Sequence, residues 1–363
     1  MSNVNLYNVG LSERYVQEAA MYGDDLYLAR VSAQHKNIYT VITEKGEIRA
    51  EVLGKLSYLA SGSMDYPVVG DWVLVDRTED SGGNAIIHRV LTRKSFFERK
   101  AAGTGNELQI IASNIDIVFI CMSLNNDYNL RRIERYLSIA WNSMAVPVIV
   151  LTKADLCDDI KTKLAEIESV ALGVDVVVTS SMSVDGYTGI LKYLQKGETI
   201  AFIGSSGVGK STLINKLMCE EILTTKGIRE DDDRGRHATT HRQLLVIPGG
   251  GVVIDTPGMR EIQIASADLS KSFADIEELA KNCFFGDCRH ESEPKCAIKK
   301  AIEDGVLSAE RYESYKKLQQ EITFMERKGI MTAARAEKQK AIEMMGSLNA
   351  RKQMKKSNGK YKI

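Results

Sequence analysis

The chain has 363 residues, of which 48 are basic and 48 are acidic, and its composition is 44% hydrophobic and 26% charged. These values are ordinary for a globular protein and exclude wholesale disorder and fibrous structure, while roughly 100–200 residues per domain predicts two or three domains. No apolar run approaches the roughly 18–20 residues of a membrane helix, and the N-terminus lacks the layout of a secretory signal. We therefore expect a soluble, cytoplasmic, monomeric protein without a membrane partner.

Residues up to about 100 have the pattern of a β-domain. Five short runs rich in β-branched and aromatic residues are predicted strands: 27–31, 39–43, 48–52, 71–75 and 85–90. Short strands at this density predict a small closed barrel of the oligonucleotide-binding (OB) type. An SH3-like barrel fits nearly as well, and hydrophobic periodicity does not separate the two.

From about residue 101 to residue 266, buried-strand runs alternate with amphipathic helices. The apolar runs are 115–122, 147–151, 174–178, 199–203 and 252–254. Between them, residues such as Ile133 and Leu137, and then Ile160 and Leu164, recur at helical spacing. This alternation predicts an α/β domain with a mostly parallel sheet that is covered by helices on both faces.

Beyond residue 268 the chain is predicted to be helical, and its end is strongly basic. Ser308 is the expected N-cap of a helix whose apolar stripe includes Tyr312, Tyr315 and Leu318. From residue 311 to residue 363 there are fourteen basic and five acidic side chains, a net charge of +9. Such a segment fits a polyanion-binding function and, equally, a solvated terminal helix.

The apolar run 199–203 leads into the G-x-x-x-x-G-K-[ST] pattern of a phosphate-binding loop, which is followed by a helical stretch. Glycines allow backbone N–H groups to curl around a phosphate, and the helix N-terminus adds partial positive charge. We expect Lys210 to reach the β- and γ-phosphates and the Ser211 hydroxyl to ligate Mg²⁺. The predicted loop consists of Gly204, Ser205, Ser206, Gly207, Val208, Gly209, Lys210, Ser211 and Thr212.

A second nucleotide-binding element follows the run 252–254, where Asp255 begins the tetrapeptide Asp-Thr-Pro-Gly. A carboxylate at the end of a strand beside the phosphate loop can hold Mg²⁺ through water. The N–H of Gly258 can bind the γ-phosphate, so that this loop senses whether the phosphate is present.

The run 147–151 ends in Thr152, Lys153, Ala154 and Asp155, which resemble the [NT]-K-x-D guanine signature of GTPases. A carboxylate at Asp155 accepts the N1–H and 2-amino protons of guanine, and adenine offers neither on that edge. The stem of Lys153 would pack along the purine plane. Most such signatures begin with Asn, whose amide also braces the phosphate loop, so we expect Thr152 to weaken affinity and Asp155 still to discriminate.

The order of these elements differs from that of ordinary GTPases, which place the phosphate loop first. Here the base signature at 152–155 precedes the loop at 204–212. So do Ser180 and Ser181, which resemble the loop that closes over the base through a backbone N–H. A fold tolerates such a permutation because chain termini usually lie close together at the surface.

Three of the six cysteines lie in one short polar stretch together with a histidine. Cys283, Cys288, His290 and Cys296 offer three thiolates and one imidazole within fourteen residues. This set is typical of a closed tetrahedral zinc site, in which a full shell leaves no position for catalysis. We therefore predict one structural zinc ion that cross-links this stretch.

The permuted order, the barrel before it and the cysteine cluster after it resemble the small ribosomal subunit biogenesis GTPases, the family called ribosome small subunit-dependent GTPase A. The resemblance spans nearly the whole chain and includes Val-Gly-Asp-Trp-Val at 69–73 and Arg-Gly-Arg-His-Ala-Thr-Thr at 234–240. It implies an RNA-binding OB-like β-barrel at 1–100, a circularly permuted P-loop GTPase domain at 101–266, and a zinc-binding helical domain with a basic tail at 267–363.

The same resemblance implies the hydrolysis of GTP to GDP and phosphate, slow in the isolated protein and stimulated by the small ribosomal subunit during its late maturation. The flanking domains would bind rRNA, and other assembly factors would be further partners. The residues themselves indicate only guanine nucleotide, Mg²⁺, zinc and a cationic end. Two alternatives stay open: a GTP-regulated adaptor that binds protein partners with little turnover, and a P-loop ATPase if Asp155 does not face the base.

The hydrolytic residue is not the usual one. Many GTPases orient the attacking water with a glutamine after the Asp-x-x-Gly element, where this chain has Met259, which cannot hydrogen-bond a water usefully. The resemblance implies a catalytic role for His237 instead, and Thr240 or its neighbour Thr239 would ligate Mg²⁺. We expect a partner to complete the site by ordering the segment 229–241.

Overall fold

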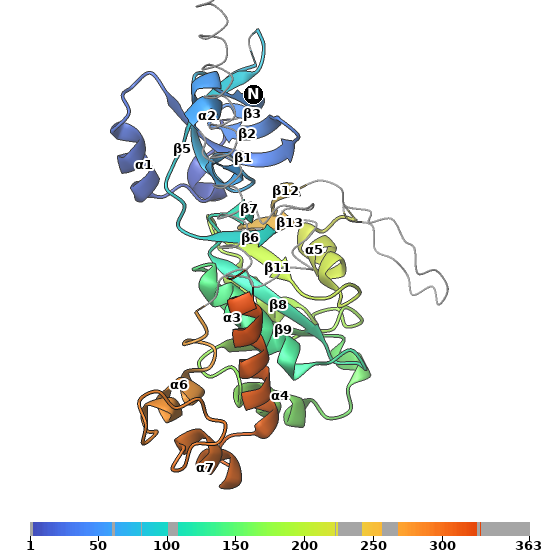
Figure 1. Cartoon of the computed structure of the whole chain (residues 1–363). Helices are drawn as coiled ribbons and strands as arrows, with labels where there is room; N and C mark the ends of the chain where they lie inside the picture. The colour runs from blue at the N-terminus through green and yellow to red at the C-terminus, as the bar shows by residue number, and fades with distance from the viewer. Residues whose placement is uncertain are drawn as a thin grey trace, which may run out of the picture.

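The computed structural model describes residues 3–59, 62–80, 82–100, 108–221, 223, 242–255, 268–324 and 327. These residues form an N-terminal barrel, a central sheet with helices on both faces, and a C-terminal group of helices (Figure 1). The barrel and the C-terminal helices lie at opposite ends of the molecule in this view, with the central sheet between them.

Five strands near the N-terminus close into a barrel. They are β1 (Tyr27–His35), β2 (Ile38–Thr43), β3 (Gly46–Val52), β4 (Trp72–Val75) and β5 (Ala85–Val90). The pairing runs β1-β2-β3-β5-β4 and returns to β1, and only β3 and β5 are parallel. Val31, Val41 and Val73 fill the interior. This five-stranded Greek-key ring confirms the OB-type barrel over the SH3-like one.

Short helices precede and connect the barrel strands. They are η1 (Leu6–Val9) and α1 (Glu13–Ala20) before β1, and α2 (Gly54–Leu59) and η2 (Ser63–Asp65) between β3 and β4. Residue Tyr15 of α1 is buried against Trp72 at the base of the barrel, with their ring centroids 5.7 Å apart. This contact joins the N-terminal segment to the barrel.

The central sheet has the α/β architecture that the alternating pattern predicts. Its strands are β8 (Ile117–Ser123), β9 (Val146–Thr152), β10 (Asp175–Val178), β11 (Thr199–Ile203), β12 (Arg242–Val246) and β13 (Val252–Asp255). The order is β10-β9-β8-β11-β13-β12, parallel except for β12.

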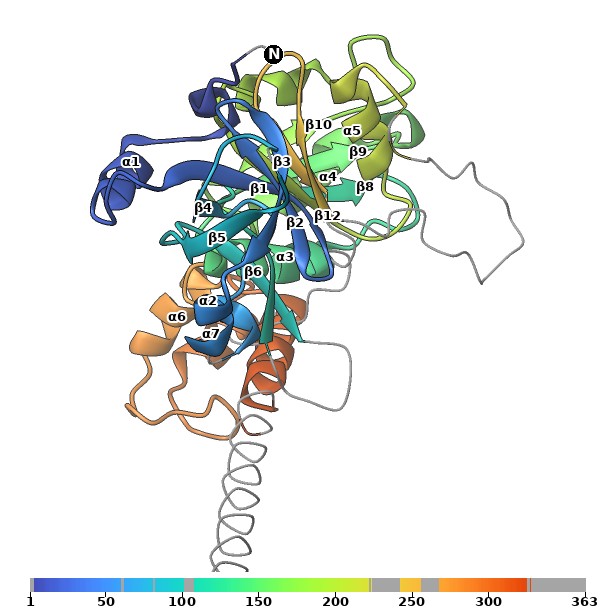
Figure 2. The ribbon, with the colours of Figure 1, turned by 90° about the horizontal axis from the view of Figure 1, so that it is seen from above.

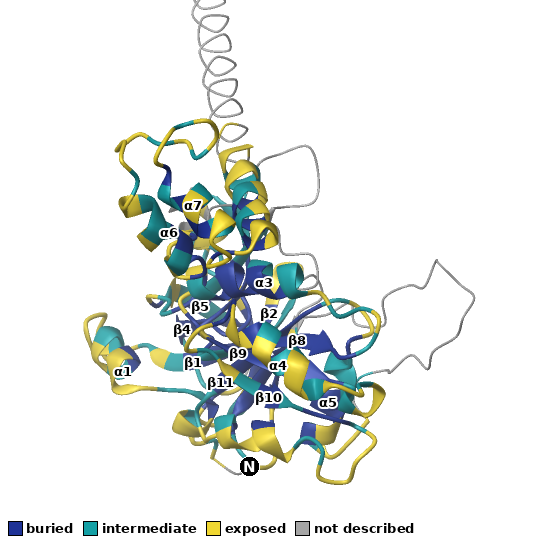
Figure 3. Cartoon of the chain, turned by 90° about the horizontal axis from the view of Figure 1, so that it is seen from below, coloured by how far each residue is buried: buried dark blue, intermediate teal, exposed yellow. Residues whose placement is uncertain are grey.

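Two apolar cores lie on the two faces of this sheet. Along β8, Val118 belongs to one core and the next residue, Phe119, to the other, as the period of a strand requires. The first core contains residues of α3 (Leu130–Asn142) and α4 (Ile160–Glu168), and the second contains residues of η4 (Thr188–Tyr193) and α5 (Lys210–Met218). Figure 3 shows the strands as the buried centre, with α4 mostly exposed or intermediate on the outside and α5 mostly buried or intermediate.

The barrel and the central sheet are joined through β12, which lies between β1 and β13 (Figure 2). On β12, Gln243 is paired with Ala33 of the barrel on one side and with Asp255 on the other. A separate two-stranded sheet of β6 (Phe96–Lys100) and β7 (Leu108–Ser113) lies at the same junction. The barrel is therefore one strand away from the strand that carries Asp255.

The C-terminal helices pack on the α3 side of the sheet. They are α6 (Ala274–Lys281), α7 (Ala297–Glu303) and the helical residues 309–324. Phe273, Ile298 and Tyr315 belong to the same core as Ile133 of α3. The hydroxyl of Ser308 accepts the N–H of Arg311 at 3.1 Å, which confirms the predicted cap.

The predicted fold class is confirmed, and some short elements were missed. The strands β6, β7 and β12 and the helix α1 were not predicted, because each is short, and charged residues in β6, β12 and α1 also mask the apolar pattern. The predicted domain boundaries at residues 100 and 266 remain predictions.

Candidate functional site

The sequence motifs gather at one edge of the central sheet. The strands β8, β9, β10, β11 and β13 are parallel, so their carboxyl ends share an edge. The phosphate loop follows β11, the Thr-Lys-Ala-Asp signature begins at the end of β9, and Ser180 follows β10. Open parallel sheets bind ligands at this edge.

The loop 204–212 has the backbone of a phosphate cradle. Its three glycines, Gly204, Gly207 and Gly209, have φ angles of 143°, 78° and 100°, values that side chains strongly disfavour. A Cβ on Gly204 would also lie 2.4 Å from the carbonyl oxygen of Cys121. The Nζ of Lys210 lies over the loop and donates to the carbonyl oxygen of Gly204 at 2.6 Å. The loop is therefore preformed, with its lysine already folded back over it.

The remaining loop residues differ in how far they are exposed. Ser206 and Gly207 are exposed, Ser205 is half-buried, and Val208 is fully buried under the loop. Helix α5 begins at Lys210, so Ser211 and Thr212 lie in its first turn. The first N–H groups of a helix have no partner within the helix, and those of α5 lie where the loop ends, as an anion site requires.

Thr152 joins the base signature to the phosphate loop. It is buried at the end of β9, and its hydroxyl donates to the carbonyl oxygen of Val208 at 2.5 Å. In ordinary guanine signatures an asparagine amide braces the loop from this position. The shorter threonine makes its own brace here, so the substitution at this position does not leave the loop without support.

Asp155 and Ser180 meet across the ends of β9 and β10. The hydroxyl of Ser180 donates to the carboxylate of Asp155, and the N–H of Ala154 donates to the carbonyl oxygen of Thr179 at 3.1 Å. Asp155 is exposed and Ser180 is buried. The carboxylate is thus held in place while its face stays open to solvent.

The backbone around Asp155 is shaped for this exposure. Lys153 has a φ of 56°, in the left-handed region, and starts the short helix η3 (Ala154–Leu156). On the β10 side, the N–H of Ser180 is already bonded to the carbonyl oxygen of Gly186 at 2.8 Å. Ser181 is half-buried beside it. Of this serine pair, Ser181 is therefore the residue whose N–H could face a base.

Asp255 ends β13, next to the strand that leads into the phosphate loop, and is half-buried. Of the residues predicted to complete the site, Gly258, Met259, His237, Thr239 and Thr240 lie outside the described residues. The described part of the site therefore contains the guanine signature, the phosphate loop and two of the predicted magnesium ligands, Ser211 and Asp255.

Sequence reasoning missed a contact between α3 and the phosphate loop. The Nη1 of Arg132 donates to the Ser205 hydroxyl at 2.6 Å and to both carboxylate oxygens of Asp127 at 3.0 Å. Burial raises the pKa of Tyr136, one helical turn further on, while Arg132 and a hydrogen bond with Ser205 lower it. Spacing places Arg132 and Tyr136 on one helix face, but only the adjacency of β8 and β11 shows what that face meets.

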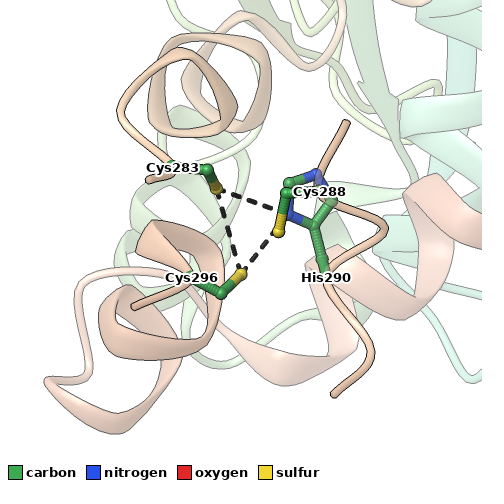
Figure 4. A group of neighbouring side chains, drawn as sticks. All are labelled: Cys283, Cys288, His290 and Cys296. Atoms are coloured by element: carbon green, nitrogen blue, oxygen red, sulfur yellow. Dashed lines mark hydrogen bonds between the residues drawn. The ribbon is translucent and has the colours of Figure 1, made fainter. Parts of the chain in front are cut away.

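The predicted metal ligands lie together in the C-terminal region (Figure 4). Cys283 follows α6 and Cys296 caps α7, while Cys288 and His290 come from the loop between these helices. All four ligand atoms lie within 4.8 Å of one another. His290 has a φ of 60°, which turns its ring back toward the cysteines.

The spacing of these atoms fits a tetrahedral metal. The His290 Nδ1 lies 3.5 Å from the Cys283 sulfur and 3.3 Å from the Cys296 sulfur, and the two sulfurs are 4.0 Å apart. Ligands of a tetrahedral zinc, at bonds of about 2.0–2.3 Å, lie roughly 3.5–3.8 Å from each other. The cluster could therefore hold a metal ion.

Comparison with known proteins agrees with this arrangement. A profile of the RsgA GTPase family matches residues 90–265. The chain is 47% identical over 352 residues to "Small ribosomal subunit biogenesis GTPase RsgA 2" of Lactiplantibacillus plantarum, with 97% of this chain and 98% of that relative covered. The chain belongs to the RsgA GTPase family. RsgA of Methanosarcina acetivorans is 41% identical over 338 residues, which cover 92% of this chain and 89% of that protein.

Solved structures also match. YjeQ from Thermotoga maritima aligns with a TM-score of 0.60 and 29% identity, covering 82% of this chain and 99% of that chain. YloQ, described as a circularly permuted GTPase, aligns with a TM-score of 0.58 and 24% identity, covering 82% and 95%. The permuted GTPase fold that the order of the RsgA motifs predicts is thereby confirmed. Among the described residues, no helix is both long and apolar enough to cross a membrane.

Proposed function

We propose that this GTPase binds its nucleotide at the carboxyl edge of the central sheet, with Asp155 reading the guanine and the loop 204–212 holding the phosphates. The observation that carries the proposal is the hydrogen bond from Thr152 to Val208. It connects the base signature directly to the phosphate loop, although 56 positions separate these residues in the chain. The two motifs thus meet at one edge of the central sheet.

We propose the following roles in nucleotide binding for the described residues. The carboxylate of Asp155 accepts the two guanine donors, the stem of Lys153 lies along the ring, and the N–H of Ser181 faces the base. We propose that Lys210 exchanges the carbonyl of Gly204 for the β- and γ-phosphate oxygens when nucleotide binds. Ser180 positions Asp155 by donating its hydroxyl to the carboxylate. Ala154 donates its N–H to the carbonyl oxygen of Thr179 and so holds the signature beside the end of β10.

Mg²⁺ would be held by the hydroxyls of Ser211 and Thr240 and, through water, by Asp255. A bound magnesium ion neutralises charge on the β- and γ-phosphates. We propose His237 as the residue that orients the attacking water, since Met259 cannot, and Gly258 as the backbone donor to the γ-phosphate. Ser211 and Asp255 are the described members of this group, and the strand that ends at Asp255 lies beside β11, as the proposal requires.

We propose the small ribosomal subunit and its rRNA as the partner that stimulates hydrolysis. Relatives of this chain are named for the biogenesis of that subunit. An OB-type barrel commonly binds oligonucleotides, and the net charge of +9 over residues 311–363 suits a polyanion. Such work would place the protein in the cytoplasm, as a monomer that meets other assembly factors on the subunit.

We propose that the ion held by Cys283, Cys288, His290 and Cys296 is zinc and that it is structural. The ligand set is complete without water and links the end of α6 to the start of α7. Elemental analysis of purified protein should give about one zinc per chain. Metal-free protein with an unchanged thermal unfolding curve would contradict a structural role.

The proposed activity is tested by GTP turnover with and without purified small ribosomal subunits. We expect slow hydrolysis alone and a marked increase with subunits, which falls as salt rises because phosphate contacts release counterions. His237→Ala should lower the stimulated rate with little loss of nucleotide affinity. An equal rate with and without subunits would refute stimulation. If the protein bound subunits in the presence of a nonhydrolysable GTP analogue but did not hydrolyse GTP, the adaptor function would be favoured.

A further inference from the structure

Helix α3 contacts two parts of the molecule that are far apart in sequence. Its first turns reach the phosphate loop through Arg132, and its next residues reach the C-terminal helices through Glu134 and Arg135. The helix follows directly from β8, which lies beside the strand that leads into the loop. It is therefore well placed to fix the loop from one side.

The contact on the loop side is specific and charge-assisted. Ser205 accepts a hydrogen bond from Arg132, which is in turn paired with Asp127 through both carboxylate oxygens. The N–H of Asp127 donates to the side chain of Asn125 at 3.1 Å, which fixes the acid. The second residue of the loop is thus held by a side chain of α3.

The contact on the other side keeps α3 from shifting. Glu134 is fully buried and accepts a 2.7 Å hydrogen bond from Arg311. Arg135 forms a two-pronged pair with Glu321, with N···O distances of 2.6 and 2.8 Å. Both partners belong to the C-terminal helix 309–324. Because α3 is anchored in this way, the guanidinium of Arg132 occupies a fixed position, from which it can restrain the phosphate loop.

The phosphate loop needs such a restraint because it is rich in glycine. Without restraint, backbone freedom at Gly204, Gly207 and Gly209 would spread its N–H groups over many directions. Thr152 fixes it at Val208, near its helix end. Arg132 fixes it at Ser205, near its strand end. The two hydrogen bonds come from different elements, β9 and α3, and together restrain both ends of the loop.

We propose that Arg132 is a positioning residue for nucleotide binding, which acts through Ser205 to hold the phosphate loop in its binding conformation. This rests on the proposed guanine nucleotide site. Because the loop surrounds the phosphates that GDP and GTP share, Arg132→Ala should weaken both nucleotides by about tenfold, the size expected for one charge-assisted hydrogen bond. Hydrolysis at saturating GTP should change much less.

The test is a double-mutant cycle on the full-length protein, with GDP and a nonhydrolysable GTP analogue titrated against Arg132→Ala, Ser205→Ala and the double variant. We expect each single variant to lose affinity and the double variant to bind no worse than the weaker single one. Within the described residues, Nε and Nη2 of Arg132 make no hydrogen bond, so a direct contact with phosphate is the competing role. Additive losses in the double variant would show that Arg132 contacts phosphate directly and would overturn the proposal. Unchanged affinity in Arg132→Ala would also overturn it.

A matched control separates this effect from a general loss of charge or fold. Arg131 is the neighbouring residue on α3 and pairs with Glu134 instead of the loop. Arg131→Ala should keep the wild-type affinity, and an equal loss there would overturn the proposal. If Arg132→Ala does not fold, Arg132→Lys with Ser205→Ala forms the same cycle. Wild-type protein that fails to bind GTP would refute the proposed site itself, whereas normal wild-type binding with additive variants would refute only Arg132.

Discussion

The two junctions of the central domain are built in different ways. At the barrel junction, β1 pairs with β12, Gly70 lies against the backbone of Ser113, and the fully buried Arg30 donates to carbonyl oxygens and to the Thr199 hydroxyl at 2.9 Å. Burial lowers the pKa of Arg30 to about 10, although the nearby Asp116 and Asp71 act in the opposite direction. At the C-terminal junction, by contrast, α3 is attached through ion pairs of Glu134 and Arg135.

This difference indicates how each neighbour can influence the nucleotide edge. A ladder of backbone hydrogen bonds with close backbone contacts tolerates little movement, so the barrel and the sheet should behave as one rigid body. The C-terminal junction is held by a shared apolar core and by ion pairs, and ion pairs depend on charge and salt. Its strength should therefore vary with salt more than that of the barrel junction. Substitutions at the barrel junction therefore test packing, and substitutions at the C-terminal junction test charge.

The largest effect is expected at the barrel junction from Gly70→Ala. Gly70 has a φ of 96°, and an added Cβ would lie 2.2 Å from the carbonyl oxygen of Ser113. Strain and steric overlap together should lower the free energy of unfolding by about 4 kcal/mol, measured by urea denaturation.

Gly82→Ala is the matched control for this change. Gly82 has a φ of 95° but no heavy atom within 4 Å of an added Cβ. It should cost only the backbone strain, about 1–2 kcal/mol. Equal losses in the two variants would show that the barrel junction is not as tightly packed as the contact with Ser113 indicates.

The next largest effect is expected at the C-terminal junction from Arg311→Met. Glu134 is fully buried and its main partner is Arg311, whose side chain is 8% exposed and which also pairs with Asp275. Leaving this carboxylate without that partner should lower the free energy of unfolding by about 3 kcal/mol.

The ionic nature of that loss can be checked with two further variants. Adding Glu134→Leu to Arg311→Met should restore most of the stability, because no buried charge then remains unpaired. Lys317→Met, at a surface pair with a 75% exposed lysine, should change stability by no more than about 0.5 kcal/mol. A double variant as unstable as the single one would mean that packing, not charge, holds this junction.

Sequence patterns predicted what depends on neighbours along the chain. Buried strands, amphipathic helices, the loop at 204–212 and the cysteine spacing are all local, and the structure has them where they were expected. The segment 69–73 was noted only as a family match. Its reason became visible in the structure, because Gly70 and Asp71 contact β7 and Arg93 at the barrel junction.

The contacts that hold the regions together had no local signal. Arg30 meets Thr199 across 169 positions, and Arg311 meets Glu134 across 177. A charged residue in an apolar run, such as Arg30 in β1, suggests a buried partner without saying which one. The Arg132–Ser205 contact likewise depends on strand order within the sheet, which the motifs alone do not determine.

A smaller effect on stability is expected at the barrel junction when the pH is raised. Burial raises the pKa of Tyr15 from 10.0 to about 12, and its hydroxyl donates to the Asn114 side chain at 2.8 Å. The stabilisation by this neutral hydroxyl is therefore complete below pH 10 and is lost as the pH rises through about 12. Two units correspond to about 2–3 kcal/mol.

Tyr15→Phe should therefore lose less stability between pH 10 and pH 12 than the wild type does, as measured by thermal unfolding in both buffers. Tyr58→Phe, at a tyrosine that is 89% exposed, should keep the wild-type alkaline loss. If Tyr15→Phe showed that same loss, ionisation of Tyr15 would have no part in the stability of the barrel junction.

The central claim is that Asp155 reads the purine of a nucleotide whose phosphates lie in the loop that begins at Gly204. Competition between GTP and XTP for Asp155→Asn protein tests it most directly, since an asparagine amide can donate to the 2-carbonyl of xanthine where the carboxylate accepted from guanine. We predict that the variant loses at least about tenfold in GTP affinity and gains preference for XTP. An unchanged preference for GTP over XTP would contradict the account.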